Sequence, residues 1–103
     1  MSTFGSFEVD QQMKDEYLAY GQSTLDDIER ALLSLSTEET SSKLEDIRRQ
    51  IHSLKGTGTS YGFPDVTRIC GLLEDSIKQQ RSGLLEFLKE GMKDLRDVLK
   101  KPT

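Results

Sequence analysis

The spacing of apolar residues constrains the fold of this chain more than any other feature of its sequence. Between residues 42 and 100, apolar side chains recur every three or four positions, which is the period of an amphipathic α-helix. The only two prolines, Pro64 and Pro102, lie at a predicted junction and near the C-terminus, so the segments between them lack the strongest helix breaker. The sequence shows no alternating β pattern and no internal repeat. We therefore expect an all-helical chain.

Loop and capping signals divide the chain into four predicted helices, at roughly residues 7–35, 42–61, 64–80 and 83–100. A polar stretch follows the first helix, and Ser42 with Glu45 then has the form of a capping box that starts the second. Gly62 and Pro64 predict a tight turn before the third helix. Short connections favour antiparallel neighbours, so we predict an up-down-up-down antiparallel four-helix bundle that forms a single all-α domain over residues 1–103.

Each predicted helix has an apolar stripe that should face the core. In the first helix, which we expect to continue through Gly21 at a cost of about 1 kcal/mol relative to alanine, the stripe consists of Met13, Tyr17, Tyr20, Thr24, Ile28, Ala31 and Leu35. The stripe of the second helix consists of Leu44, Ile47, Ile51 and Leu54. The third has Val66, Ile69, Cys70, Leu73 and Ile77, and the fourth has Leu84, Leu88, Met92, Leu95 and Leu99. Gly58 lies close to the second stripe, and we expect it to contact the first helix.

Charge and cysteine content exclude several classes of function. Lys and Arg number 14 and Asp and Glu number 18, which gives a formal charge of −4 and argues against binding the nucleic-acid backbone. The single cysteine, Cys70, cannot form an internal disulfide, nor a zinc site with a single histidine. No apolar run approaches the roughly 20 residues that cross a bilayer, and the N-terminus does not have the pattern of a signal peptide. We expect a cytoplasmic protein that binds neither nucleic acid nor membranes.

The only histidine, His52, is predicted to lie on the exposed side of the second helix. At 100° per residue it is roughly 115° from the centre of that helix's apolar stripe. Lys55 follows one turn later and Gly56 four residues later, both on the side of the histidine. A neutral imidazole is a nucleophile near pH 7, and an ammonium group within reach could neutralise the oxygens of a phosphoryl group on the ring. A glycine in mid-helix is unfavourable, which a close approach by another protein would explain.

This run resembles the signature of histidine-containing phosphotransfer (HPt) domains, H-x-[LF]-K-G followed by a later glycine. The match is complete at His52, Leu54, Lys55, Gly56 and Gly62. A looser match continues into the third predicted helix, at Cys70, Leu73 and Glu74. Residues 57–61 depart from the family pattern, because they contain a second glycine and two β-branched residues where alanine or serine is usual. We expect the helix to bend or fray early there.

The resemblance implies a role for each matching residue. His52 would accept the phosphoryl group, Lys55 would stabilise it, Gly56 would leave room for the partner, and Gly62 would serve the turn. The implied partners are receiver domains of response regulators or of hybrid histidine kinases. In the family the partner's receiver domain binds Mg²⁺, so we expect no cofactor and no metal held by this chain. It would be a phosphocarrier rather than an enzyme, and its sequence has no G-x-x-x-x-G-K-[ST] loop for ATP.

A different class of function stays open from the sequence alone. In this alternative the chain is a helical adaptor that binds a partner protein by shape, and His52 is incidental. We expect a monomer, because a single bundle accounts for all the predicted stripes. We also expect a free-standing protein, with a domain excised from a larger kinase as the open alternative. The cognate kinase, the response regulator, the direction of phosphoryl flow, the pathway output and the docking residues are not encoded in a readable way.

Overall fold

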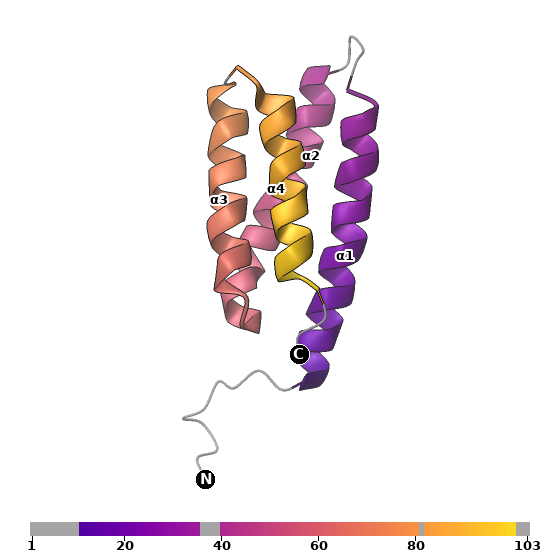
Figure 1. The fold of residues 1–103 in the computed structure, drawn as a ribbon, viewed down its shortest axis with the longest axis vertical. Coiled ribbons are helices and arrows are strands. Elements are labelled where there is room, and N and C mark those ends of the chain that lie inside the picture. The colour runs from indigo at the N-terminus through magenta and orange to yellow at the C-terminus, as the bar shows by residue number, and fades with distance from the viewer. Residues whose placement is uncertain (1–10, 36–39, 81, 101–103) are drawn as a thin grey trace.

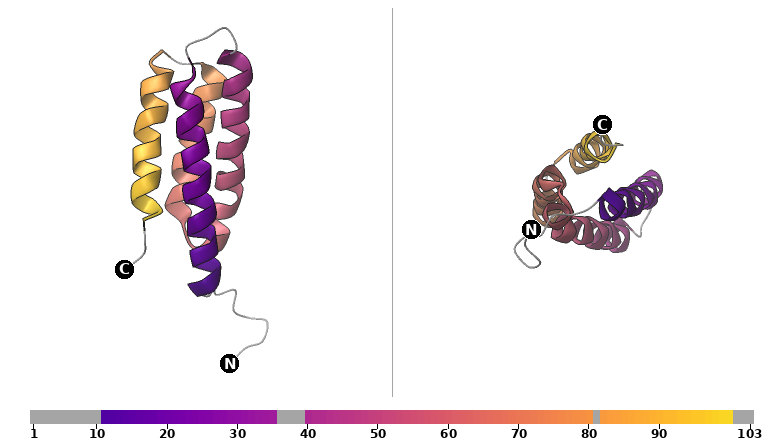
Figure 2. Two further views of the ribbon diagram at one scale, coloured as in Figure 1. Left: turned by 90° about the vertical axis from the view of Figure 1, so that its right-hand side faces the viewer. Right: turned by 90° about the horizontal axis from the view of Figure 1, so that it is seen from below.

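The computed structural model describes residues 11–35, 40–80 and 82–100, and these form an antiparallel bundle of four α-helices (Figure 1). The helices are α1 (Gln11–Leu33), α2 (Thr40–Gly58), α3 (Pro64–Gln79) and α4 (Leu84–Val98), and a short 3₁₀ helix, η1 (Thr59–Tyr61), follows α2. Figure 2 shows them standing side by side, with α3 between α2 and α4. The predicted all-α, up-down-up-down four-helix bundle is confirmed. None of the described helices is both long enough and apolar enough to cross a membrane.

The cores of α2, α3 and α4 follow the predicted stripes. Fully buried side chains from these helices include Ile47, Ile51, Leu54, Val66, Cys70, Leu88 and Leu95, and Leu99, which directly follows α4, is also fully buried. Leu44 and Leu84, at the start of their stripes, are only partly buried. Burying one such aliphatic side chain contributes roughly 1.5–3 kcal/mol, so these stripes supply most of the driving force for the bundle.

The predicted stripe of α1 is confirmed at Tyr17, Thr24 and Ile28, but the buried face as a whole lies part of a turn away from the predicted one. Met13 and Tyr20 are exposed, and the buried residues are Tyr17, Leu18, Gly21, Thr24, Leu25, Ile28 and Leu32. Their centre lies about 60° round the helix from the predicted one. The cause is the packing of α4, because Gly21 lets the Leu99 side chain approach so closely that a Cβ would lie 2.8 Å from its Cδ1. The helix continues through Gly21, as predicted.

The predicted start of the second helix also needs correction. The helix begins at Thr40, so Ser42 lies inside its first turn and the capping box is wrong at that position. The residues just before Thr40 fall outside the described part of the chain, as does the predicted start of the first helix at residue 7. Helix ends placed from a local capping pattern commonly differ by one or two residues from those in a structure.

The end of α2 is built around the hydroxyl group of Thr67 on α3. This hydroxyl donates to the Lys55 carbonyl oxygen at 3.0 Å and accepts from the Thr59 N–H at 3.0 Å. It is thus inserted into the bond that would continue the α-helix, and the chain tightens into η1, in agreement with the early bend expected there. Gly58 makes this possible, since a Cβ would lie 2.7 Å from the Thr67 Oγ1. The expected contact of Gly58 with the first helix was therefore wrong; the glycine faces α3.

Three structural features stabilise the turn into α3. Gly62 adopts φ +89°, in the left-handed region that favours glycine, and its N–H donates to the Thr59 carbonyl oxygen at 3.1 Å. Pro64 occupies the first turn of α3, where its missing N–H costs nothing. Tyr17 of α1 stacks on Tyr61 with ring centroids 4.9 Å apart and donates to the Leu54 carbonyl oxygen at 3.1 Å. The turn at Gly62, the start of α3 and the Tyr17 contact from α1 together hold the second half of α2 in place.

Candidate functional site

His52 lies on the outer surface of α2, and its side chain is 61% exposed. The predicted orientation away from the core is therefore what the structure shows. Its Nδ1 atom lies 3.0 Å from Oε2 of Glu74, a residue of α3 that is only 2% exposed. The histidine is anchored at one ring nitrogen, and Nε2 has no hydrogen-bond partner among the described residues.

Glu74 is the centre of this site, and it joins three side chains of α2 (the Glu74 cluster: Arg48, His52, Lys55 and Glu74). The Lys55 Nζ lies 2.8 Å from its Oε1, and the Arg48 Nη1 donates to its Oε2 at 3.0 Å. Oε1 receives no well-directed hydrogen bond, so Lys55 neutralises it as an ion pair by proximity. A buried carboxylate is costly unless it is paired in this way.

The ionisation of Glu74 decides the state of the histidine ring. The Lys55 ammonium, with a smaller effect from His52, holds the pKa of Glu74 below its usual range, although burial acts in the opposite direction. The carboxylate is thus ionised at neutral pH and can only accept hydrogen bonds. Nδ1 of His52 must therefore carry the ring proton and donate a hydrogen bond to Glu74. In the neutral ring this leaves the lone pair on Nε2, the nitrogen that has no hydrogen-bond partner among the described residues.

Lys55 is half-buried and its cation is held in place by the carboxylate. Glu74 raises the pKa of Lys55, so the ammonium stays charged across the physiological range. The Lys55 carbonyl accepts the hydrogen bond from Thr67, which fixes the backbone at the same position. The sequence placed Lys55 on the side of His52, and the structure shows that the two side chains meet at one carboxylate.

Arg48 is the second cation of the Glu74 cluster, and it reaches two acids at once. Its guanidinium binds Glu45 through Nε at 3.0 Å and Nη2 at 2.6 Å, while Nη1 binds Glu74. The two acids raise the pKa of Arg48. Its neighbour Arg49 pairs with Glu45 at 3.7 Å and does not reach Glu74. Arg48 therefore shares the oxygen to which His52 donates.

Gly56 and the aromatic residues beside the site complete this face. A Cβ built on Gly56 would meet no heavy atom within 4 Å, so the space over it is open. Gly62 lies at the turn after η1, away from the Glu74 cluster. Tyr20, which was predicted to be in the core, is exposed, and its hydroxyl is hydrogen-bonded to Ser53 Oγ at 2.7 Å, next to His52. The surface around the histidine is thus partly aromatic on the α1 side.

Sequence reasoning placed His52, Lys55 and Gly56 on one face but did not identify Glu74 as the residue that joins them. A signal was present, because Glu74 is an acid between the buried positions Leu73 and Ile77 of α3. A carboxylate in an apolar stripe requires partners, and the basic face of α2 supplies them.

Comparison with known proteins adds one match. A sequence model described as the Hpt domain matches residues 12–99. Searches of curated proteins and of solved structures give no significant match. The matched segment covers the four helices except for Gln11 at the start of α1, and it includes the whole Glu74 cluster.

Proposed function

Because this chain belongs to the Hpt domain family, we propose that it is a phosphocarrier of a two-component phosphorelay. In this proposal His52 accepts a phosphoryl group from the aspartate of a receiver domain, or from a kinase, and passes it to a response regulator. The observation that supports it most is the bond between Nδ1 of His52 and the ionised Glu74, because it leaves the lone pair on the exposed Nε2.

The transfer step follows from this geometry. The Nε2 lone pair attacks the phosphorus atom of the aspartyl phosphate, an N–P bond forms, and the P–O bond to the aspartate breaks with its electron pair leaving on the carboxylate. The ring then carries a positive charge, which the carboxylate of Glu74 stabilises through Nδ1–H. The reverse reaction loads the next receiver. This chain would contribute the nucleophile and its orientation, and the partner's receiver domain would supply the Mg²⁺ that offsets the negative charge during transfer.

Lys55 and Gly56 have distinct parts in this proposal. The ammonium of Lys55 lies one helical turn from His52, within reach of phosphoryl oxygens on the ring, and Glu74 keeps it charged. The open space over Gly56 admits the receiver's aspartate and loops. Gly62 acts on the fold, through the left-handed turn that ends η1.

The experiment is phosphoryl transfer from a panel of radiolabelled phospho-receivers in the presence of Mg²⁺. We expect label on the wild-type chain, lost on acid treatment as a phosphohistidine requires, and no label on His52→Gln. Circular dichroism checks that the variant keeps its helices. If no receiver labels the folded wild-type protein, the carrier proposal fails and the adaptor alternative replaces it, since an adaptor would keep its partner when His52 is replaced.

A further inference from the structure

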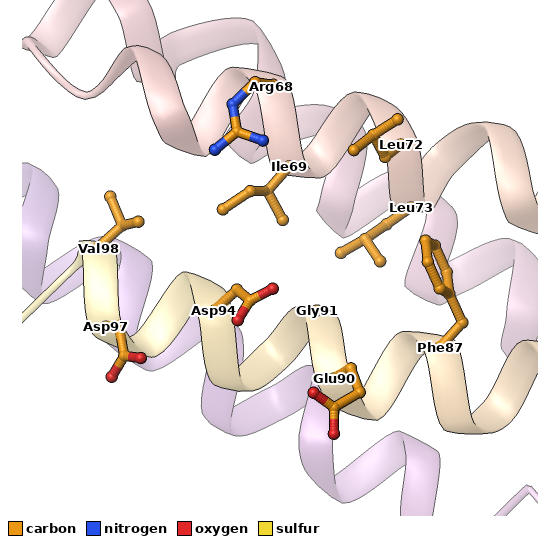
Figure 3. Close-up of a pocket in the computed structure, with 10 residues that line it drawn as sticks. All are labelled: Arg68, Ile69, Leu72, Leu73, Phe87, Glu90, Gly91, Asp94, Asp97 and Val98. Atoms are coloured by element: carbon orange, nitrogen blue, oxygen red, sulfur yellow. The ribbon is translucent and has the colours of Figure 1, made fainter.

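An apolar groove runs between α3 and α4, on the side of α3 opposite the Glu74 cluster. One part of it is a hollow of about 370 Å³. Figure 3 shows Ile69 of α3 and Phe87 of α4 pointing into this hollow, with Leu72 lying over α3 beside it. A second hollow of about 370 Å³ continues from it toward Gly83. Phe87 and Glu90 line both, so the two form one groove along α4. The residues of α4 that line the groove run from Leu84 to Val98, the full 15 residues of the helix, so the groove is about 22 Å long.

The floor of the groove is fixed, whereas its apolar rims are exposed. A Cβ on Gly91 would lie 2.4 Å from Cδ2 of Leu73, so α3 and α4 are in close contact there. The rims are formed by Leu72, which is 53% exposed, and Phe87, which is 43% exposed. An apolar hollow between exposed apolar rims has the shape that receives the apolar face of a helix.

One edge of the groove carries a row of carboxylates, at Glu86, Glu90, Asp94 and Asp97. Their spacing of four, four and three residues places them on one face of α4. Within the described residues Glu86 and Asp94 have no ion pair, and Glu90 and Asp97 have only exposed pairs, with Lys93 at 3.8 Å and Lys100 at 3.6 Å. Such exposed pairs contribute little. Among the described residues, Arg68 is the one cation that lines the groove.

We propose that this groove binds an amphipathic helix of a partner protein, with an apolar face flanked by Lys or Arg. The length and apolar floor fit a helix of about four turns, as in other helix-in-groove complexes. The row of carboxylates selects a basic flank. A second copy of this chain fits worse, because it has a net charge of −4 and would bring the same row of carboxylates to the contact.

An occupied groove would leave His52 accessible. Leu72 and Glu74 are two residues apart on α3, so their side chains point about 160° apart round the helix. The first faces the groove and the second faces α2. The inference therefore goes beyond the proposed function and does not depend on it: the bound helix would tether the protein while the histidine face stays free.

The test is a titration of the ¹⁵N-labelled full chain with synthetic peptides at 0.15 M salt, followed by NMR. One 15-residue helical peptide has leucines on one face and lysines elsewhere. A second has glutamate at every lysine position, and a third has the composition of the first with its leucines spread round the helix. We expect only the first to bind, with shifts at Leu72, Phe87 and Gly91 and none at His52.

Matched variants separate the groove from general attraction between opposite charges. Asp94→Lys should weaken binding about fivefold, the effect of one rim charge, and Asp46→Lys, a similar reversal on α2, by less than twofold. Phe87→Ala should also weaken binding, whereas Leu33→Ala, an exposed leucine outside the groove, should not. The proposal would be overturned if the two charge reversals weakened binding equally, or if the shifts spread over all acidic surfaces. It would also be overturned if the glutamate peptide bound, or if the chain associated with itself through the groove.

Discussion

Replacing Gly56 with alanine should make this protein more stable and a poorer phosphocarrier. The added Cβ would meet nothing within 4 Å, so the substitution introduces no clash. Alanine is favoured over glycine by about 1 kcal/mol inside a helix, since glycine loses more backbone freedom on folding. We therefore expect Gly56→Ala to raise the free energy of unfolding by about 1 kcal/mol, which corresponds to about 4–8 °C in Tm for a domain of this size.

Two other glycines provide controls of the opposite sign. At Gly58 a Cβ would lie 2.7 Å from Thr67 Oγ1 and 3.0 Å from the Phe63 carbonyl oxygen, neither of which can yield without breaking the end of α2. At Gly91 it would lie 2.4 Å from a Leu73 side chain that is itself buried. Overpacking of this kind costs about 1–3 kcal/mol. Gly58→Ala and Gly91→Ala should both lower the midpoint of urea denaturation, whereas Gly56→Ala should raise it.

The functional half of the prediction uses the same variant. Gly56→Ala should slow phosphoryl transfer from a receiver by about tenfold, equivalent to 1.4 kcal/mol of barrier. A less stable Gly56→Ala protein would refute the reasoning about the open space over this glycine. A more stable protein that accepts label at the wild-type rate would show that Gly56 has no part in receiver access.

Three further predictions concern the buried groups. Glu74→Gln should lower the free energy of unfolding by about 1–3 kcal/mol at pH 7. Because the pKa of Glu74 is lowered in the folded state, the ionised carboxylate contributes its full stabilisation above about pH 4.3, and this stabilisation is lost as the pH falls through the folded pKa. The urea unfolding curves of the two proteins should therefore converge in acid. Lys55→Met should raise the pKa of Glu74 in a ¹³C NMR titration, and Lys78→Met, whose ammonium is 4.0 Å away and largely exposed, should raise it less. Burial raises the pKa of Cys70 to about 12, so at pH 8 its thiolate fraction falls on the order of 1,000-fold below that of an unfolded cysteine. Iodoacetamide should therefore label the folded chain far more slowly than the urea-unfolded chain, as followed by mass spectrometry, and equal rates would contradict its burial.

The sequence was sufficient to predict the fold where a helix has only one apolar face. In α2, α3 and α4 the spacing of residues such as Ile47 and Ile51 leaves one stripe to bury, and that stripe is buried. The first helix has more apolar residues than the bundle can cover, so periodicity could not decide between Tyr20 and Leu25. The close approach of Leu99 to Gly21 decided it, and this contact joins residues far apart in the chain.

The same distinction explains what could be predicted of the site. His52, Lys55 and Gly56 lie within five residues on one helix, so their common face follows from helical geometry. Glu74 comes 22 residues after His52. Its meeting with the histidine depends on how α3 is set along α2, which no local pattern encodes. For the same reason Gly58 could be expected near a buried surface, but not assigned to α3 rather than α1.

The Glu74 cluster also bears on how readily a phosphoryl group could leave this protein. The two cations closest to the buried carboxylate, Arg48 and Lys55, are already balanced by Glu45 and Glu74. A phosphoryl group on His52 would add a charge of about −1.5 to −2 beside these cations. In the proposed relay it would therefore compete with the Glu74 carboxylate for Lys55 and Arg48. That competition would weaken the electrostatic stabilisation of the loaded protein and so favour release of the phosphoryl group to a partner.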